Sequence, residues 1–194
     1  MILENIKQIK DIRQHLPQPS RPLELEIGCG KGKFLLAKSQ KQMDTTFIGL
    51  DWSWKWMKVG VERAQKQQRE NIHFYQGEAM DFLCNHITLE SVKTLHLYFP
   101  DPWPKKKHNK RRIFKPAFIQ RVFDILIPGG HLSVATDYLD YYTVMQDVLY
   151  RARSQWKSIR HSNTREKDPD CKTNYEIKYE IEGRRFSYLL LEKG

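Results

Sequence analysis

Residues 23–32, LELEIGCGKG, decide the fold that the sequence predicts. The segment opens with the alternating apolar residues of a strand and runs into three closely spaced glycines. A helix is expected directly afterwards, over residues 33–41, with Phe34 and Leu35 on its buried side. A strand, a glycine turn and a helix in this order are typical of an α/β fold with parallel strands.

Strands and helices alternate along the rest of the chain. The further strands are expected at residues 47–51, 72–75, 94–99, 131–136, 156–160 and 185–192, and the further helices at residues 53–69, 79–86, 116–126, 138–153 and 174–182. This alternation predicts an α/β, Rossmann-like fold whose seven-stranded sheet is mostly parallel and carries helices on both faces. The last strand is expected to be antiparallel, because little helix separates the final two strands.

The length of 194 residues suits one domain with a substantial core and is too short for two. Before the first strand, apolar residues at positions 6, 9, 12 and 16 indicate a helical segment within residues 1–20, which the prolines from Pro17 onward end. Within this single domain we expect two substrate loops, at residues 100–115 and 161–176.

The net charge of +10 favours an anionic polymer as a partner. The charge is concentrated at residues 105–112, KKKHNKRR, where six of eight residues are Lys or Arg. Such a run is also typical of an ordinary solvated loop. Here, apolar segments on both sides tie the ends of the run to a core, which favours a functional loop.

The three cysteines, Cys29, Cys84 and Cys171, lie far apart and form no C-x-x-C pair. We therefore expect neither a zinc site nor a disulfide framework, and reduced thiols indicate a cytoplasmic protein. The first residues lack the apolar core of a signal peptide, and no segment has the length and hydrophobicity of a membrane span. The sequence is compatible with a monomer or a homodimer.

Carboxylates stand at the ends of three successive predicted strands. Glu26 precedes the glycine turn, and Asp51 and Glu78 follow the next two strands. Because the carboxyl ends of parallel strands meet at one edge of a sheet, we expect these acids to surround one ligand. Asp51 is suited to bond both hydroxyls of a ribose, and Glu78 to accept from the amine of an adenine.

The glycine spacing argues against a dinucleotide site. Gly28, Gly30 and Gly32 are expected to present backbone N–H groups to the ligand, but Lys33 stands where the G-x-G-x-x-G pattern needs its third glycine. Glu26 would also repel a pyrophosphate. An adenosine that carries a cation in place of phosphates fits better, and S-adenosylmethionine is such a ligand. The alternative is a tight turn with a purely structural purpose.

The strand at residues 94–99 runs into Pro100-Asp101-Pro102-Trp103. The prolines end the strand, because proline has no N–H group to give to a sheet. Asp101 is thereby placed at the carboxyl end of the strand, next to an aromatic residue and the basic run. An acid, an aromatic ring and a cationic segment favour an enzyme that acts on one base of a nucleic acid. An ordinary turn remains the alternative.

The motifs LEIGCGKG, IGLD, GEA and YFPDPWPKKKHNKRR together closely resemble those of the bacterial tRNA (guanine-N7-)-methyltransferase family, as do the later ATDY and TNYE. The resemblance runs from about residue 23 to the C-terminus. The combination of FPDPW and HNKRR is specific, whereas many methyltransferases share the glycine turn. The resemblance implies a class I methyltransferase fold that transfers a methyl group from S-adenosylmethionine to N7 of a variable-loop guanosine in tRNA.

The resemblance also implies roles for individual residues. It assigns the cofactor, or the space around its methyl group, to Glu26, Asp51, Glu78 and Asp101. It assigns substrate binding to Lys105, Asp137, Thr173, Asn174, Tyr175 and Glu176, and RNA contacts to Lys107, His108, Asn109, Lys110, Arg111 and Arg112. The chain departs from the family where Asp51 replaces the usual glutamate, where Glu78 replaces a common aspartate, and in its short N-terminal extension.

Several of these residues have a second interpretation. The pair Thr173 and Glu176 also forms a capping-box pattern at the start of a helix. Asp137 also suits the N-cap of the helix that follows it. Trp52, next to Asp51, is expected either to flank the adenine ring or to lie in the core.

Guanine N7 has an in-plane lone pair and no proton, so methylation there needs no general base. We therefore assign Asp101 a catalytic role through charge placement beside the purine, with cofactor binding alone as the alternative. Three other functions remain open. They are methylation of an exocyclic amine, for which Asp-Pro-Trp resembles the D-P-P-Y type of motif, a nicotinamide-dependent dehydrogenase, and RNA binding without catalysis.

Overall fold

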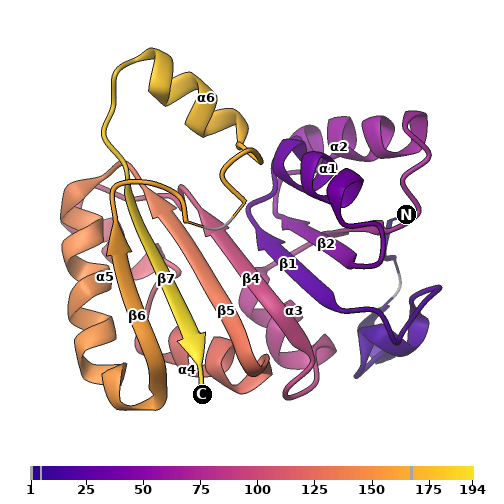
Figure 1. Cartoon of the computed structure of the whole chain (residues 1–194), viewed down its shortest axis with the longest axis horizontal. Helices are drawn as coiled ribbons and strands as arrows, with labels where there is room; N and C mark the ends of the chain where they lie inside the picture. Colours follow the sequence, from indigo (N-terminus) through magenta and orange to yellow (C-terminus); the bar gives the residue numbers. More distant parts are fainter. Residues whose placement is uncertain (1, 5, 167) are drawn as a thin grey trace.

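The computed structural model describes residues 2–4, 6–166 and 168–194. Residues 1, 5 and 167, which belong to the expected segments 1–20 and 161–176, lie outside the described residues. The strands are β1 (Leu23–Ile27), β2 (Thr46–Asp51), β3 (Ile72–Gln76), β4 (Val92–Tyr98), β5 (Leu126–Thr136), β6 (Trp156–Ser162) and β7 (Ser187–Lys193). The α-helices are α1 (Lys33–Lys41), α2 (Trp54–Lys66), α3 (Ala79–His86), α4 (Pro116–Ile125), α5 (Leu139–Ala152) and α6 (Asn174–Ile181) (Figure 1).

The seven strands form one sheet in the order β3-β2-β1-β4-β5-β7-β6. The first five strands are parallel, and β7 is antiparallel to both β5 and β6. This confirms the predicted α/β fold and its antiparallel last strand. The chain order reverses between β1 and β4, and ligands of open α/β sheets bind outside the carboxyl ends of the strands at such a point.

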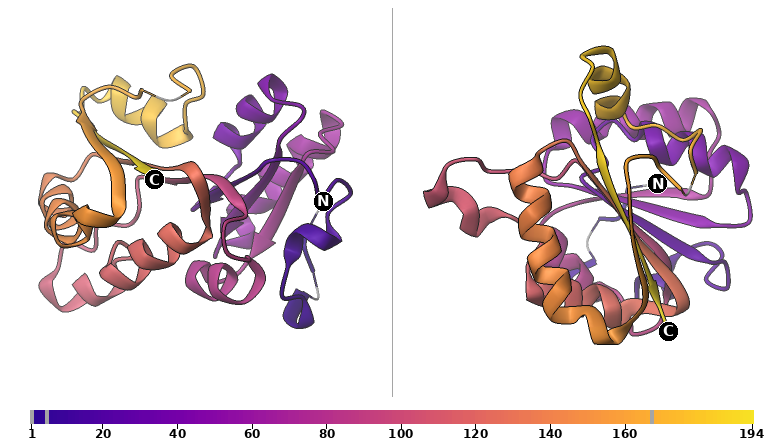
Figure 2. Two further views of the ribbon diagram at one scale, coloured as in Figure 1. Left: turned by 60° about the horizontal axis from the view of Figure 1, so that its bottom comes forward. Right: turned by 60° about the vertical axis from the view of Figure 1, so that its left-hand side comes forward.

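Helices cover both faces of the sheet. Helices α1 and α2 lie on one face, while α3, α4 and α5 lie on the other (Figures 1 and 2). The buried residues Met57, Val61 and Ala64 recur at helical spacing along α2, so one stripe of this helix faces the sheet. The central strand β1 is buried at every position, as expected for a strand covered on both faces.

The expected bounds of α1 and α3 are confirmed, but β5 begins earlier than the sequence predicts. It starts at Leu126, directly after α4, where a turn was expected before residue 131. Val92 pairs with Leu126 and Thr94 with His131, so residues 127–130 face only Lys93 and bulge from the strand. The Pro-Gly-Gly sequence therefore forms an irregularity inside the strand, because glycine permits the backbone conformation that a bulge needs.

The N-terminal segment forms two 3-10 helices, η1 (Ile6–Gln8) and η2 (Ile12–His15), rather than one continuous helix. Asp11 caps η2 by accepting from the backbone N–H of Arg13, which breaks the segment in two. The apolar spacing of three residues, which suggested an α-helix, fits the three residues per turn of a 3-10 helix. The Leu3 N–H donates to the carbonyl of Phe74, so this segment also pairs with the edge strand β3.

Candidate functional site

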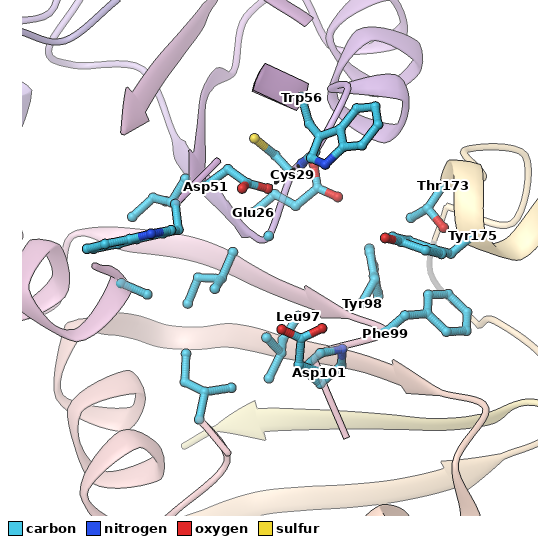
Figure 3. A pocket seen from close by; sticks show the side chains of 18 of the residues that line it. Glu26, Cys29, Asp51, Trp56, Leu97, Tyr98, Phe99, Asp101, Thr173 and Tyr175 are labelled. Carbon is cyan, nitrogen blue, oxygen red and sulfur yellow. Dashed lines mark hydrogen bonds between the residues drawn. The ribbon is translucent and has the colours of Figure 1, made fainter. Parts of the chain in front are cut away.

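A cleft of about 910 Å³ opens beside the glycine turn, at the carboxyl ends of β1, β2 and β4 (Figure 3). Its lining combines the predicted cofactor acids with the start of α6. The predicted site residues that line it are Glu26, Gly28, Gly30, Asp51, Glu78, Asp101, Thr173, Asn174, Tyr175 and Arg111. Its lining does not include the other predicted site residues, which are Gly32, Lys105, Lys107, His108, Asn109, Lys110, Arg112, Asp137 and Glu176.

Asp51 holds the glycine turn against the end of β2. Its Oδ2 atom accepts from the N–H of Gly30 at 2.8 Å, and its Oδ1 atom accepts from the N–H of Ser53 at 2.8 Å. Gly32 adopts the left-handed conformation at φ +65°, and a Cβ atom there would lie 3.3 Å from both Gly60 Cα and the ring of Phe74. Gly32 therefore packs the turn onto α2, while the turn before it faces the cleft. The prediction that the three glycines present their N–H groups to a ligand is wrong, because those of Gly28, Gly30 and Gly32 donate to Leu50, Asp51 and Cys29.

Glu26 is a buried carboxyl on the wall of the cleft. Its side chain is nearly inaccessible, and its Oε2 atom accepts no hydrogen bond from the described residues. Burial raises the pKa of Glu26 to about 8; the positive charge of Arg165 opposes this shift, and the charges of Asp51 and Glu176 add to it. A carboxyl with an unused oxygen in such a place is suited to a cationic ligand, whose charge would favour its ionised form.

Glu78 serves first as the N-cap of α3. Its Oε2 atom accepts from the N–H of Asp81 at 2.6 Å, which leaves Oε1 available to the cleft. Asp101 lies across the cleft from Glu26 and Asp51, with its carboxylate directed into the cleft (Figure 3). These four carboxyl groups therefore approach the same space from the ends of four different strands.

The backbone around Asp101 is strained. Phe99 and Trp103 both adopt left-handed conformations, at φ +52° and +43°. Residues with side chains rarely adopt this region, and such strain is concentrated at functional sites. The N–H of Phe99 donates to the carbonyl of Ala135 at 2.7 Å, so β5 supports this sharp turn. The turn directs Asp101 away from the sheet and into the cleft.

The basic segment forms a 3-10 helix, η3 (Lys106–Arg111), on one side of the cleft. The guanidinium of Arg111 lies 4.8 Å from the ring centroid of Trp103, and the His108 ring meets the same indole edge-on. Arg112 is buried instead, because its Nε donates to the carbonyl of Pro102 at 2.7 Å and its guanidinium lies over Tyr141. Arg112 is therefore set apart from its exposed basic neighbours.

The capping box at the start of α6 is confirmed. Thr173 Oγ1 accepts from the N–H of Glu176 at 3.0 Å, and Glu176 Oε2 accepts from the N–H of Thr173 at 2.7 Å. Glu176 is buried, and the guanidinium of Arg165 pairs with it at 2.5 Å. The box places the Tyr175 side chain at the cleft (Figure 3), whereas Glu176 is not among the lining residues.

Two alternative interpretations from the sequence are wrong. Asp137 does not cap α5, whose N-cap is Tyr138; its Oδ2 atom accepts from Nη1 of Arg184 at 2.7 Å. Asp137 thereby joins the end of β5 to the segment after α6. Trp52 does not lie in the core, because its side chain is 75% exposed at the rim of the cleft.

A buried ionic cluster next to the site was not foreseen. Lys38 Nζ lies 2.6 Å from both Glu24 Oε2 and Asp168 Oδ2, and His96 Nε2 lies 2.9 Å from Glu24 Oε2. Burial opposes ionisation of Glu24, but His96 and Lys38 outweigh it and hold the pKa of Glu24 at about 2. Burial lowers the pKa of His96 to about 4. Charged residues at the core positions of β1 and α1 were the available sequence signal.

Arg165, like the buried ionic cluster, contributes to the site in a way that the sequence did not indicate. Its guanidinium lies 4.0 Å from the ring centroid of Tyr98 on β4, and it donates to the carbonyl of Cys171 at 3.1 Å. With its ion pair to Glu176 and the pair between Lys38 and Asp168, it fixes the segment before α6 to the sheet. The arrangement positions the start of α6 over the cleft.

The described part of the chain contains no cluster of three or more His, Cys, Asp or Glu side chains suited to a metal ion. None of its helices combines the length and the apolar character that crossing a bilayer requires. The arrangement in the cleft can hold a cationic adenosine beside a carboxylate and an exposed basic segment.

Comparisons with known proteins agree with this site. The Methyltransf_4 family model, described as "Putative methyltransferase", matches residues 20–188. The chain is 37% identical over 131 residues to a tRNA (guanine-N(7)-)-methyltransferase of Chromohalobacter salexigens, with 68% of the chain and 53% of the relative covered. It is 39% identical over 133 residues to the protein of the same name from Saccharophagus degradans, with 69% and 58% covered. The matched region thus spans little more than half of these relatives.

Solved structures show the same fold. Phosphoethanolamine N-methyltransferase 2 of Haemonchus contortus, in complex with S-adenosyl-L-methionine, superposes with a TM-score of 0.57 at 11% identity. The superposition covers 94% of this chain and 51% of that one. At this identity the likeness concerns the architecture, a mostly parallel sheet with helices on both faces.

Proposed function

The chain belongs to the Methyltransf_4 family of methyltransferases, and from this we propose that it methylates guanine N7 in tRNA with S-adenosylmethionine as the methyl donor. The names of the relatives from Chromohalobacter and Saccharophagus support the reaction and the substrate. The observation that carries the proposal is the shared cleft, in which Glu26, Asp101 and Arg111 lie together. It joins a site for a cationic nucleoside to a carboxylate and to the basic segment.

The residues of the cleft fit S-adenosylmethionine. Glu26 offers a buried, unused carboxyl oxygen where a positive charge would compensate its burial. Asp51 has lone pairs left for ribose hydroxyls after accepting two backbone N–H groups, and Glu78 Oε1 is free for the adenine amine. Trp52, exposed beside Asp51, is placed to cover the adenine. When bound, the cofactor supplies an electrophilic methyl group on a sulfonium.

Asp101 acts on the substrate base by its charge. Guanine N7 attacks through a lone pair, so no residue has to remove a proton. The attacking purine becomes positive, and a carboxylate fixed beside it stabilises that charge. The strained turns at Phe99 and Trp103 keep Asp101 in the cleft, while Thr173, Asn174 and Tyr175 position the base from the side of α6.

The exposed cations hold the RNA. Those available for phosphates are Lys105, Lys106, Lys107, Lys110 and Arg111, with His108 and Asn109 between them. We assign Arg112, Asp137 and Glu176 to positioning, because each is bonded within the protein. Arg112 holds the base of the basic segment, and the other two hold the segment around α6. We also propose a cytoplasmic location, which a tRNA substrate supports.

The test is methyl transfer from labelled S-adenosylmethionine to bulk tRNA, followed by nucleoside analysis. We expect N7-methylguanosine as the product. Label on an exocyclic amine would assign the chain to a different base methylation. Binding of tRNA without any transferred label would identify an RNA-binding protein that lacks this activity.

A further inference from the structure

Trp56 is a large apolar side chain that the fold does not use. It lies in the first turn of α2, and its side chain is 46% exposed. The buried stripe of that helix consists of Met57, Gly60, Val61 and Ala64, so the indole makes no part of the core. An exposed aromatic ring at the mouth of a cleft indicates a binding surface.

Two cations lie over this indole. Lys31 Nζ, from the glycine turn, is 5.0 Å from the centroid of the Trp56 ring, and Lys55 Nζ is 5.2 Å from it. As described, α2 has no acidic residue in its first turn and no side-chain cap. The two ammonium groups therefore place positive charge around one exposed ring. Positive charge with an aromatic face is complementary to a nucleotide.

The position of Trp56 separates it from the basic segment. Figure 3 shows Trp56 on one side of the cleft and Asp101 on the opposite side, with Tyr175 of α6 at the end of the cleft between them. Trp103 and Arg111 line the cleft near Asp101. An RNA strand that enters the cleft past the basic segment thus meets Trp56 on the far rim.

We propose that Trp56, Lys31 and Lys55 form a second RNA contact, in which an unpaired base takes the place of an ammonium group over the indole and the ammonium groups pair with the neighbouring phosphates. The inference rests on the proposed function, which makes tRNA the partner. Stacking needs an open face of a base, so the contacted nucleotide lies outside a duplex. Trp52 has a different role, because it follows Asp51 on the side proposed for the adenosine.

The experiment compares the two tryptophans. Affinities of Trp56→Ala, Trp56→Phe and Trp52→Ala are measured for tRNA and for a single-stranded oligoribonucleotide by fluorescence anisotropy, and for S-adenosylmethionine by calorimetry. Trp56→Ala is expected to weaken RNA binding by about 5- to 150-fold with unchanged cofactor affinity, and Trp56→Phe to retain most of it. Tyr150→Ala, at a residue 80% exposed on α5, is the matched control and should change neither.

Salt dependence separates stacking from charge. Trp56→Ala should leave the slope of log affinity against log salt unchanged, because stacking releases no counterions. Lys31→Ala and Lys55→Ala should each reduce the magnitude of this slope by roughly 0.7 to 0.9. A Trp56→Ala variant that keeps full RNA affinity would overturn the inference. A Trp56→Ala variant that loses affinity only for S-adenosylmethionine would also overturn it. Binding to phosphatidylglycerol vesicles is measured in addition, to test a membrane surface as the partner, and a loss of vesicle binding with RNA binding intact would overturn the inference too.

The outcomes also separate this inference from the proposed function. If Trp56→Ala weakens RNA binding but the native chain makes no N7-methylguanosine, the stacking contact stands and the proposed reaction fails. If the native chain makes N7-methylguanosine and Trp56→Ala binds RNA normally, the reaction stands and the stacking contact fails.

Discussion

Replacing Glu26 with glutamine should stabilise the ligand-free protein, and increasingly so as the pH rises. Glutamine keeps the size of the side chain and removes the charge. The pKa of Glu26 is raised from 4.5 to about 8 in the folded chain. Below about pH 4.5 the carboxyl is protonated in both the folded and the unfolded chain, so its ionisation costs no stability. Between that pH and 8 the unfolded chain has lost the proton and the folded chain still holds it, so the unfolding free energy of the native chain falls as the pH rises. Above pH 8 both are ionised, and this loss of stability no longer grows.

The magnitude follows from the size of the pKa change. One pKa unit corresponds to about 1.4 kcal/mol, so the rise of the pKa from 4.5 to about 8 corresponds to roughly 5 kcal/mol of unfolding free energy at pH 9. Near pH 4.5 the same substitution should change stability little. S-adenosylmethionine should bind the glutamine variant more weakly, because the carboxylate that faces its positive charge is gone.

Urea unfolding of the cofactor-free protein at pH 5, 7 and 9 tests this reasoning. The difference in unfolding free energy between Glu26→Gln and the native chain should increase with each step in pH. Glu62→Gln, at an exposed carboxylate of α2 that pairs with Lys58 at 3.7 Å, is the control and should show only a small difference. A Glu26→Gln difference that is constant with pH, or that shrinks as the pH rises, would refute the argument.

Four further variants test the other parts of the site. Asp101→Ala should lower kcat on the order of 10²-fold with little change in the KM for S-adenosylmethionine, because it removes charge stabilisation beside the base; steady-state kinetics measure both. The double variant Lys110→Ala, Arg111→Ala should reduce the salt slope of tRNA binding by roughly 2, whereas Arg112→Ala should instead lower the unfolding free energy. Lys38→Met should cost about 3–5 kcal/mol in urea unfolding, because Glu24 loses its buried cation.

Each expectation has a contrary result. A raised cofactor KM with kcat intact would restrict Asp101 to cofactor binding. An unchanged salt slope in the double variant would remove the basic segment from the RNA interface. Lys38→Met unfolding at the native urea concentration would show that the buried cluster contributes nothing to stability.

Local pattern was sufficient for most of the fold. The apolar periodicity gave α1 and α3 their observed bounds, and the spacing of Thr173 and Glu176 predicted a capping box that the structure contains. The bulge at residues 127–130 was missed, because Pro-Gly-Gly is equally typical of a turn. The two helices and the capping box were predicted correctly because neighbouring residues alone determine their conformation. The bulge was not, because its conformation depends on pairing with β4.

The parts of the site that sequence did not reveal depend on distant partners. Lys38 contacts Asp168, which lies 130 residues further along the chain, and no periodicity links the two positions. Arg112 looks identical to its neighbours in the basic run, and only its burial against Tyr141 distinguishes it. Such roles follow from tertiary packing, which a one-dimensional pattern does not contain.

The place of β7 between β5 and β6 has a consequence for biosynthesis. Until residues 187–193 leave the ribosome, β5 has an open edge and β6 has no neighbour to pair with. The nascent protein can complete the strands around the glycine turn early, but α6 gains its final support only when this strand is inserted. Tyr188 of β7 donates to Glu176 of α6 at 3.2 Å. The start of α6, which is proposed to position the base, therefore gains its support after the basic segment and the glycine turn are already in place.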